Sequence, residues 1–210
     1  KELRTEVARA FADAQPERIR LYAHGEMDDP STRAFRDCSE ALPYKRYLAG
    51  RLIDLHHREA PANSDAIRVR TPDDCSFYPE YEEHYEAFWK ARPDLKPFVR
   101  IESRDDLERY RAAGGLRLVE VDGALAGVFA ALPQTSRGLR GWCMHERMLF
   151  GEFRGRRLGA AALWRFARTL PAEQGAVLYG TIVPDNQPSL RSAKKLGRLD
   201  IGGTWWLMTG

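Results

Sequence analysis

The sequence has few of the features that mark a secreted, metal-binding or membrane-spanning protein. It contains only 3 cysteines in 210 residues, Cys38, Cys75 and Cys143. Their spacing fits neither a disulfide framework nor a metal site, so we expect a reducing, cytoplasmic environment and no bound metal. No uninterrupted apolar run approaches the roughly 20 residues that a membrane-spanning helix needs, and we therefore expect no membrane partner.

The sequence also lacks a large excess of charge of one sign. Lys and Arg total 33 against 30 Asp and Glu, which gives a formal net charge of +3. Nucleic-acid-binding domains usually carry a clear basic surplus, so we expect no nucleic-acid partner. The hydrophobic fraction of 43% and the charged fraction of 30% are ordinary for a globular protein. The length fits one domain with an additional segment, or two very small domains.

The pattern of residues 1–65 predicts a mainly helical segment. Leu3, Val7 and Phe11 recur at four-residue spacing, which indicates one face of a helix over residues 1–15. We expect a short strand over residues 17–25 and a second helix over residues 28–42. Residues 44–59 fit a helix or a strand equally well. The small, polar stretch APANSDA at residues 60–66 is typical of a linker, and we place a domain boundary between residues 65 and 66.

Residues 66–210 predict a single domain with a mixed α/β sheet. The expected order is a strand, two helices, three mostly antiparallel strands, a helix, a strand, a helix and a final strand. The clearest local signal is LRLVEVDGALAGVFAAL at residues 116–132, which reads as two strands joined by a two-residue turn at Asp122 and Gly123. This order of elements indicates helices that flank a mostly antiparallel central sheet.

The turn RGRRLG, residues 154–159, joins an apolar strand to an alanine-rich helix. The first backbone amides of a helix have no partner within the helix, and the helix dipole makes this end attractive to anions. The two glycines of the turn would let a ligand approach the backbone, and its three arginines would add positive charge. These features favour a site for a pyrophosphate group. An ordinary strand-to-helix turn with solvated arginines fits the turn equally well when it is considered alone.

The same region resembles the Gcn5-related N-acetyltransferase (GNAT) superfamily, over about residues 66–210. The family's acyl-CoA signature is Gln/Arg-x-x-Gly-x-Gly/Ala at a strand-to-helix turn, which RGRRLG matches except at one position. NQPSLRSAKKLG, residues 186–197, is similar to a second family element one strand later. The resemblance implies a GNAT-like fold that uses acetyl-CoA as cosubstrate. The residues that it implies for binding acetyl-CoA are Leu149, Phe150, Arg154, Gly155, Arg156, Arg157, Leu158, Gly159, Ala160 and Asn186.

Two positions depart from the family pattern. Arg157 stands where the family has the first glycine of its signature, so its side chain either crowds the pyrophosphate or reaches it as a charge. Ala193 stands where many members carry a tyrosine that protonates the leaving thiolate. Because a thiol has a pKa of about 8.5, such an acid is useful rather than obligatory.

The strand GWCMHERML, residues 141–149, carries the candidates for a general base. The resemblance implies that the backbone amide of Leu149, or of its neighbour, binds the thioester carbonyl. It also implies a base four or six residues before Leu149, at His145 or Cys143. Strict alternation along the strand places His145 on the same face as Leu149, and its unperturbed pKa of about 6.5 suits a base. We rank His145 first and Glu146 second, since Glu146 would need a bulge to reach that face; a purely structural His145 is the alternative.

These observations predict an N-acyltransferase that moves an acetyl group from acetyl-CoA to the amine of a small-molecule or amino-acid-like acceptor by direct attack. The alternatives are a non-catalytic CoA-binding regulator of the same fold and a protein N-acetyltransferase. The oligomeric state stays open, with a homodimer among the options. In the amino-terminal segment, residues 21–35 are similar to residues 178–193, which raises the hypothesis that it is half of a degenerate GNAT repeat.

Overall fold

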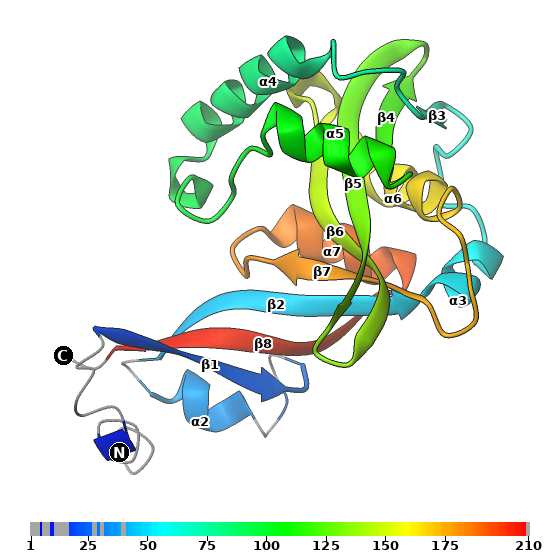
Figure 1. The fold of residues 1–210 in the computed structure, drawn as a ribbon. Coiled ribbons are helices and arrows are strands. Elements are labelled where there is room, and N and C mark those ends of the chain that lie inside the picture. Colours follow the sequence, from blue (N-terminus) through cyan, green and yellow to red (C-terminus); the bar gives the residue numbers. More distant parts are fainter. Residues whose placement is uncertain are drawn as a thin grey trace. The chain divides into compact units, whose positions relative to one another are not determined.

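A computed structural model describes residues 5, 9–10, 17–26, 29, 32–38 and 41–208 (Figure 1). The chain forms two compact units. The first comprises Lys1–Leu48, Thr181–Pro184 and Asp200–Gly210, and the second comprises Ala49–Gly180 and Asp185–Leu199. The second unit begins at Ala49. The predicted functional boundary between residues 65 and 66 stays a prediction.

The second unit holds a mixed sheet with strand order β7-β6-β5-β4-β3. Neighbouring strands are antiparallel except for β6 and β7, which are parallel. This arrangement confirms the predicted α/β class. The elements are α3 (Leu52–His57), β3 (Ile67–Arg70), α4 (Tyr78–Ala91), η2 (Pro93–Leu95), α5 (Arg104–Ala112), β4 (Leu116–Val121), β5 (Ala124–Ser136), β6 (Leu139–Leu149), η3 (Gly151–Phe153), α6 (Gly159–Ala167), β7 (Val177–Ile182) and α7 (Gln187–Leu196).

The β4–β5 hairpin has the turn that its sequence predicts. Asp122 and Gly123 both have positive φ angles, of 52° and 84°. A two-residue turn with two positive φ angles matches the right-handed twist of its strands, and Asp-Gly tolerates it well. The turn therefore sets the pairing of the residues next to it, and the register shifts once, between Val119 and Glu120.

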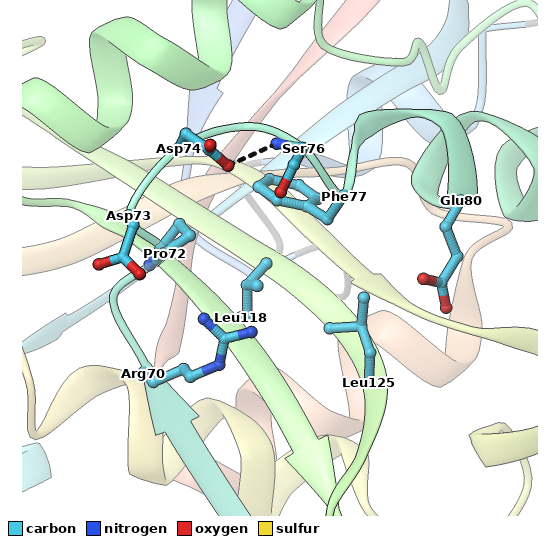
Figure 2. A pocket seen from close by; sticks show the side chains of 9 residues that line it. All are labelled: Arg70, Pro72, Asp73, Asp74, Ser76, Phe77, Glu80, Leu118 and Leu125. Atoms are coloured by element: carbon cyan, nitrogen blue, oxygen red, sulfur yellow. Dashed lines mark hydrogen bonds between the residues drawn. The ribbon is translucent and has the colours of Figure 1, made fainter.

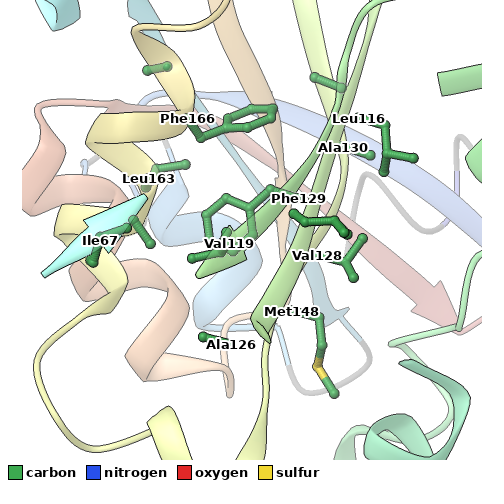
Figure 3. Close-up of a cluster of buried hydrophobic side chains, with 14 of the residues drawn as sticks. Ile67, Leu116, Val119, Ala126, Val128, Phe129, Ala130, Met148, Leu163 and Phe166 are labelled. Atoms are coloured by element: carbon green, nitrogen blue, oxygen red, sulfur yellow. The ribbon is translucent and has the colours of Figure 1, made fainter. Parts of the chain in front are cut away.

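The core lies between the sheet and the helices on its two sides. Figure 1 shows α4 and α5 in front of the sheet and α6 and α7 behind it. Helix α6 is nearly all apolar and buries seven of its nine residues. Phe129 of β5 packs edge-on against Phe166 of α6, with ring centroids 5.7 Å apart (Figure 3). Because α6 is anchored in this way, the turn in front of it has a fixed position relative to β6.

The first unit contains β1 (Arg18–His24), α2 (Arg33–Arg36), most of β2 (Ala41–Arg51) and β8 (Leu199–Met208), in the strand order β1-β8-β2. Strands β1 and β8 pair antiparallel along their whole shared length. Arg46 and Asp200 form a buried ion pair, with Arg46 Nη2 2.8 Å from Asp200 Oδ1. The same nitrogen donates to the carbonyl of Gly25 over 2.6 Å.

The prediction of a mainly helical amino-terminal segment is wrong for the described residues. Strands β1 and β2 are 7 and 11 residues long, whereas α2 and α3 have 4 and 6 residues. Pro43 and the tyrosines at 44 and 47 favour an extended chain, and strand pairing stabilises it. Residues 44–59, for which a helix and a strand were both possible, contain first a strand and then a helix, because β2 ends at Arg51 and α3 starts at Leu52. Of the predicted helix over residues 1–15, the structure describes only Thr5, Arg9 and Ala10, which are helical. The Pro30-Ser31 part of the proposed repeat lies outside the described residues.

Candidate active site

The edge of β6 that faces β7 is paired over only part of its length. The parallel pairs run from Gly141 with Val177 to Cys143 with Tyr179. Strand β6 continues for six more residues, to Leu149, without a further pair to β7 among the described residues. An unpaired strand edge presents N–H and C=O groups to which an extended ligand can bind.

At the end of this edge, one backbone N–H group points away from β5. Phe150 N–H donates to the carbonyl of Ala126 in the β5 direction, over 2.8 Å. Because N–H groups alternate in direction along a strand, the N–H of Leu149 points away from β5. The carbonyl of Leu149 accepts a hydrogen bond of 2.6 Å from Arg154 Nε. The predicted donor for a thioester carbonyl at Leu149 thus has the right direction.

A bulge in β6 changes which side chains share a face. Glu146 pairs with Ala130 and Met144 pairs with Ala131, so His145 is the extra residue. The expectation that His145 and Leu149 share a face is therefore wrong. His145 stacks on Tyr110 of α5, with ring centroids 5.1 Å apart. After the bulge, Glu146 and Met148 lie on the face that α4 and α5 cover. Leu149 follows Met148 in the strand and therefore lies on the opposite face.

Glu146 is buried in a cage of hydrogen-bond donors on the α4 side. Its Oε2 accepts from the hydroxyls of Tyr81 and Tyr85, the latter over 2.9 Å. Its Oε1 accepts from the N–H of Arg147 over 2.6 Å. Only 4% of Glu146 is exposed. Burial raises the pKa of its carboxyl to about 7, although the tyrosine hydroxyls favour the charged form. Glu146 can therefore exchange a proton near neutral pH.

His145 has a more open setting. Its side chain is exposed at the bulge, next to Tyr110, whose hydroxyl donates to Glu102 Oε2 over 2.5 Å. Partial burial lowers the pKa of His145 below its usual value of 6.5, and the nearby Glu102 charge opposes that change. The bulge thus brings His145 and Glu146, the two predicted bases, to the helix-covered side that holds α4 and α5.

The N-terminus of α6 is open toward the predicted pyrophosphate turn. Leu158 occupies the N-cap position without a side-chain cap, and the first turn contains no acidic residue. In contrast, Ser103 caps α5 and Asn186 caps α7. The free amides of α6 remain available to an anion. Gly155 has a φ of +76°, and a Cβ added there would meet no atom within 4 Å, so a ligand has room at this position.

The three arginines of the turn have different surroundings. Arg154 bends back to β6, where its guanidinium lies 4.6 Å above the ring of Phe88. Arg156 lies over Phe153 and 4.0 Å from Asp122. Arg157 is exposed and adopts a left-handed backbone with a φ of 61°. Such a conformation explains why this position suits glycine. Of the three, Arg157 is the side chain best placed for a ligand at the turn.

Replacing Arg157 with glycine should separate charge from backbone strain. Relief of a left-handed conformation is worth about 1–2 kcal/mol, and the entropy of glycine offsets about 0.5–1 kcal/mol of it. The unfolding midpoint should therefore stay the same or rise slightly. Loss of a charge-assisted bond of about 1.5–3 kcal/mol should weaken acetyl-CoA binding by about tenfold or more in calorimetry. Equal or tighter binding would show that the arginine only crowds the turn.

The other predicted ligand residues shape the turn through packing. A Cβ on Gly159 would lie 2.9 Å from Ser192 Oγ, so this glycine allows α6 and α7 to approach closely. The side chain of Asn186 accepts from the N–H of Ser189 and caps α7. Phe150 is buried and stacks on His84, with centroids 3.8 Å apart. Leu158 and Ala160 are also buried, so only their backbone could contact a ligand.

Three features of the site were not anticipated from the sequence. They are the pairing of Tyr81 and Tyr85 with Glu146, the burial of Arg198, and the buried Nη1 atom of the half-buried Arg147. The tyrosines lie four residues apart on one face of α4, a spacing that is visible in the sequence but says nothing about their partner. A buried arginine has no sequence signal, because arginine usually lies on the surface.

A separate pocket of about 430 Å³ lies where β3 leads toward α4 (Figure 2). None of the residues predicted to bind acetyl-CoA or to act as the base lines it. Its lining residues are Arg70, Pro72, Asp73, Asp74, Ser76, Phe77, Glu80, Leu118 and Leu125. Within the described part of the chain, no group of three or more potential metal ligands is present. No helix in that part is long and apolar enough to cross a membrane.

Comparisons with known proteins identify the family of the chain. The model of the acetyltransferase (GNAT) family matches residues 75–197. Similar structures include a protein from Drosophila malonogaster (TM-score 0.54, 14% identity, 84% of this chain and 55% of that chain). A second is a GCN5-related N-acetyltransferase from Sphaerobacter thermophilus (TM-score 0.51, 12% identity, 98% of this chain and 65% of that chain). A third is a tandem GNAT protein from the clavulanic acid biosynthesis pathway (TM-score 0.51, 18% identity, 100% of this chain and 69% of that chain). No curated protein matches the sequence. The chain therefore spans about half to two thirds of the first two of these structures.

Proposed function

Since the chain belongs to the GNAT family of acetyltransferases, we propose that it moves an acetyl group from acetyl-CoA to the amine of a small-molecule or amino-acid-like acceptor. One observation carries this proposal: the edge of β6 that is unpaired among the described residues leads, through η3 and the turn RGRRLG, to the uncapped N-terminus of α6. The first suits the extended pantetheine arm of acetyl-CoA, and the second suits its pyrophosphate. We also propose a cytoplasmic location, which the low cysteine content of 3 residues in 210 supports.

The residues present fit this cosubstrate. The first amides of α6 and the side chain of Arg157 would hold the pyrophosphate, and Gly155 leaves space for it. The N–H of Leu149 would donate to the thioester carbonyl, which gains negative charge during attack. Acetyl-CoA itself supplies the activated acyl group.

Glu146 is the general base that the geometry favours. The amine nitrogen attacks the thioester carbon, the carbon–sulfur bond breaks, and the amine loses one proton. A carboxylate with a pKa of about 7 can take that proton at neutral pH. Tyr81 and Tyr85 hold Glu146 in place and can relay a proton through their hydroxyls. The departing CoA thiolate is weakly basic and leaves without a dedicated acid. His145 is the second candidate for the base.

A non-catalytic CoA-binding regulator is the second candidate function. It is favoured by Ala193, which is fully buried at the position where many family members carry a tyrosine. The two functions differ in one measurement, the release of CoA thiol from acetyl-CoA in the presence of a panel of amines. The proposed enzyme releases thiol with at least one amine faster than without any. A protein that binds acetyl-CoA and releases no thiol with any amine would be the regulator.

A further inference from the structure

A carboxylate in the segment between η2 and α5 is tied to the hydrogen bonds around Glu146. The backbone N–H of Glu102 donates to the hydroxyl of Tyr81 over 3.2 Å, and that hydroxyl in turn donates to Glu146 Oε2. The side chain of Glu102 accepts from the hydroxyl of Tyr110 over 2.5 Å, and the ring of Tyr110 stacks on His145. Glu102 is thus held between the two tyrosines that contact Glu146 and His145.

The charge of Glu102 has no cationic partner within the described part of the chain. Its side chain is partly exposed and forms no ion pair there, and its one hydrogen-bond donor is the neutral hydroxyl of Tyr110. The guanidinium of Arg109 lies over the ring of Tyr110, but it pairs with Asp106, with Arg109 Nη2 2.7 Å from Asp106 Oδ1. A carboxylate that is partly withdrawn from water and has no cation beside it gains by binding one.

Glu146 is less suited than Glu102 to bind a cation. Its Oε2 accepts from two tyrosine hydroxyls, its Oε1 accepts from a backbone N–H, and only 4% of it is exposed. Burial raises its pKa to about 7, and the charge of Glu102 adds to this increase, so that much of Glu146 is uncharged at neutral pH. An aliphatic amine is protonated at this pH, as the lysine pKa of about 10.4 illustrates. A charged acceptor therefore needs a binding group other than the base.

We propose that the carboxylate of Glu102 binds the acceptor as an ammonium ion and thereby selects acceptors that are cationic at neutral pH. This inference rests on the proposed acetyl transfer and assigns a residue to its second substrate. Glu102 holds the cation beside Glu146 and takes up no proton. An N–H bond of the ammonium breaks, its proton goes to the Glu146 carboxylate, and the electron pair stays on nitrogen for the attack. Glu102 thus sets the KM of the acceptor, whereas Glu146 sets the turnover number.

The test replaces Glu102 with glutamine, which keeps an oxygen for the hydroxyl of Tyr110 and removes the charge. For the aliphatic amine that wild-type protein acetylates fastest, the KM of Glu102→Gln should rise about tenfold or more. Its kcat should stay within about threefold of wild type, the signature of a lost binding contact. Acetyl-CoA affinity, measured by calorimetry, should not change. Asp105→Asn, on an exposed carboxylate in the first turn of α5, is the matched control and should keep the wild-type KM.

An unchanged KM in Glu102→Gln would overturn the assignment, as would an equal rise in Asp105→Asn. A loss confined to kcat would also overturn it, because that is the effect expected of the base. If no amine yields CoA thiol, the proposed transfer itself is wrong, and calorimetry with cyclohexylamine on the CoA-bound protein then decides the ammonium site. Binding to wild type that is lost in Glu102→Gln supports the site, and equal binding to both, or none to wild type, contradicts it.

Discussion

Replacing Glu146 with glutamine should lower the turnover number at neutral pH by about a hundredfold or more, with unchanged affinity for acetyl-CoA. Glutamine keeps the size of the side chain, and the hydroxyls of Tyr81 and Tyr85 can accept from its amide as well as donate. The substitution therefore removes the proton acceptor and little else. Initial-rate kinetics with a saturating acceptor, together with calorimetry, measure the two quantities.

The pH dependence of the turnover number should also identify Glu146 as the base. Glu146 acts as a base only when it is ionised, so wild-type turnover should rise with pH through the pKa of about 7. This acidic limb should be absent in Glu146→Gln. His145→Ala is the comparison variant and should lower turnover by less than about threefold, far below the effect of losing a general base. A hundredfold loss in His145→Ala with a mild effect of Glu146→Gln would instead assign the base to His145.

The stability of the protein should report the burial of Glu146 independently of catalysis. The pKa of Glu146 in the folded protein lies above its usual value of 4.5, so folding favours the protonated form. Wild-type protein should therefore lose stability as the pH rises from about 4.5 to about 7. Glu146→Gln has no such proton to lose. Its unfolding midpoint should exceed that of wild type above pH 7, and the gain should shrink on acidification; a gain that does not depend on pH would contradict the assigned pKa.

Replacing Gly155 with glutamate should weaken acetyl-CoA binding by well over tenfold. A side chain at this position enters open space at the turn, where its carboxylate would repel the phosphates of the cosubstrate. The positive φ adds backbone strain of about 1–3 kcal/mol, which must be separated from the charge effect. Calorimetric titration with acetyl-CoA measures the affinity.

Gly138 offers a matched control for that strain. It has the same φ of +76° and equally open surroundings, but it lies in the turn between β5 and β6. Gly138→Glu should lower stability to a similar degree and leave acetyl-CoA affinity unchanged. Similar losses of affinity in both variants would show that strain, rather than charge at the turn, causes the effect.

The features that sequence predicted well depend on neighbouring residues. Asp122 and Gly123 specify their turn because few residues tolerate two successive positive φ angles. The turn before α6 was recognisable because its glycines, its arginines and the alanine-rich helix follow one another directly. The left-handed backbone of Arg157 explains why the family signature has glycine at this position, and nothing in the structure explains why this chain carries arginine there.

The features that sequence predicted poorly depend on distant partners. Because His145 is an extra residue in β6, the side chains after it lie on the opposite faces from those that strict alternation predicts. Alternation of polar and apolar residues alone cannot locate such a bulge. The environment of Glu146 comes from Tyr81 and Tyr85, more than 60 residues earlier in the chain. Strand β2 is extended because it pairs within a sheet, a context that propensity over residues 44–59 does not contain.

The most direct test of the account is the fate of the acetyl group in a reaction with acetyl-CoA and an accepted amine. Mass spectrometry of the acceptor and of the intact protein, combined with a thiol assay, follows that group completely. The account predicts one N-acetylated acceptor for each CoA thiol released and no acetyl group on the protein. Thiol release without an acetylated amine, or an acetyl group that accumulates on Cys143, would contradict direct transfer to the acceptor.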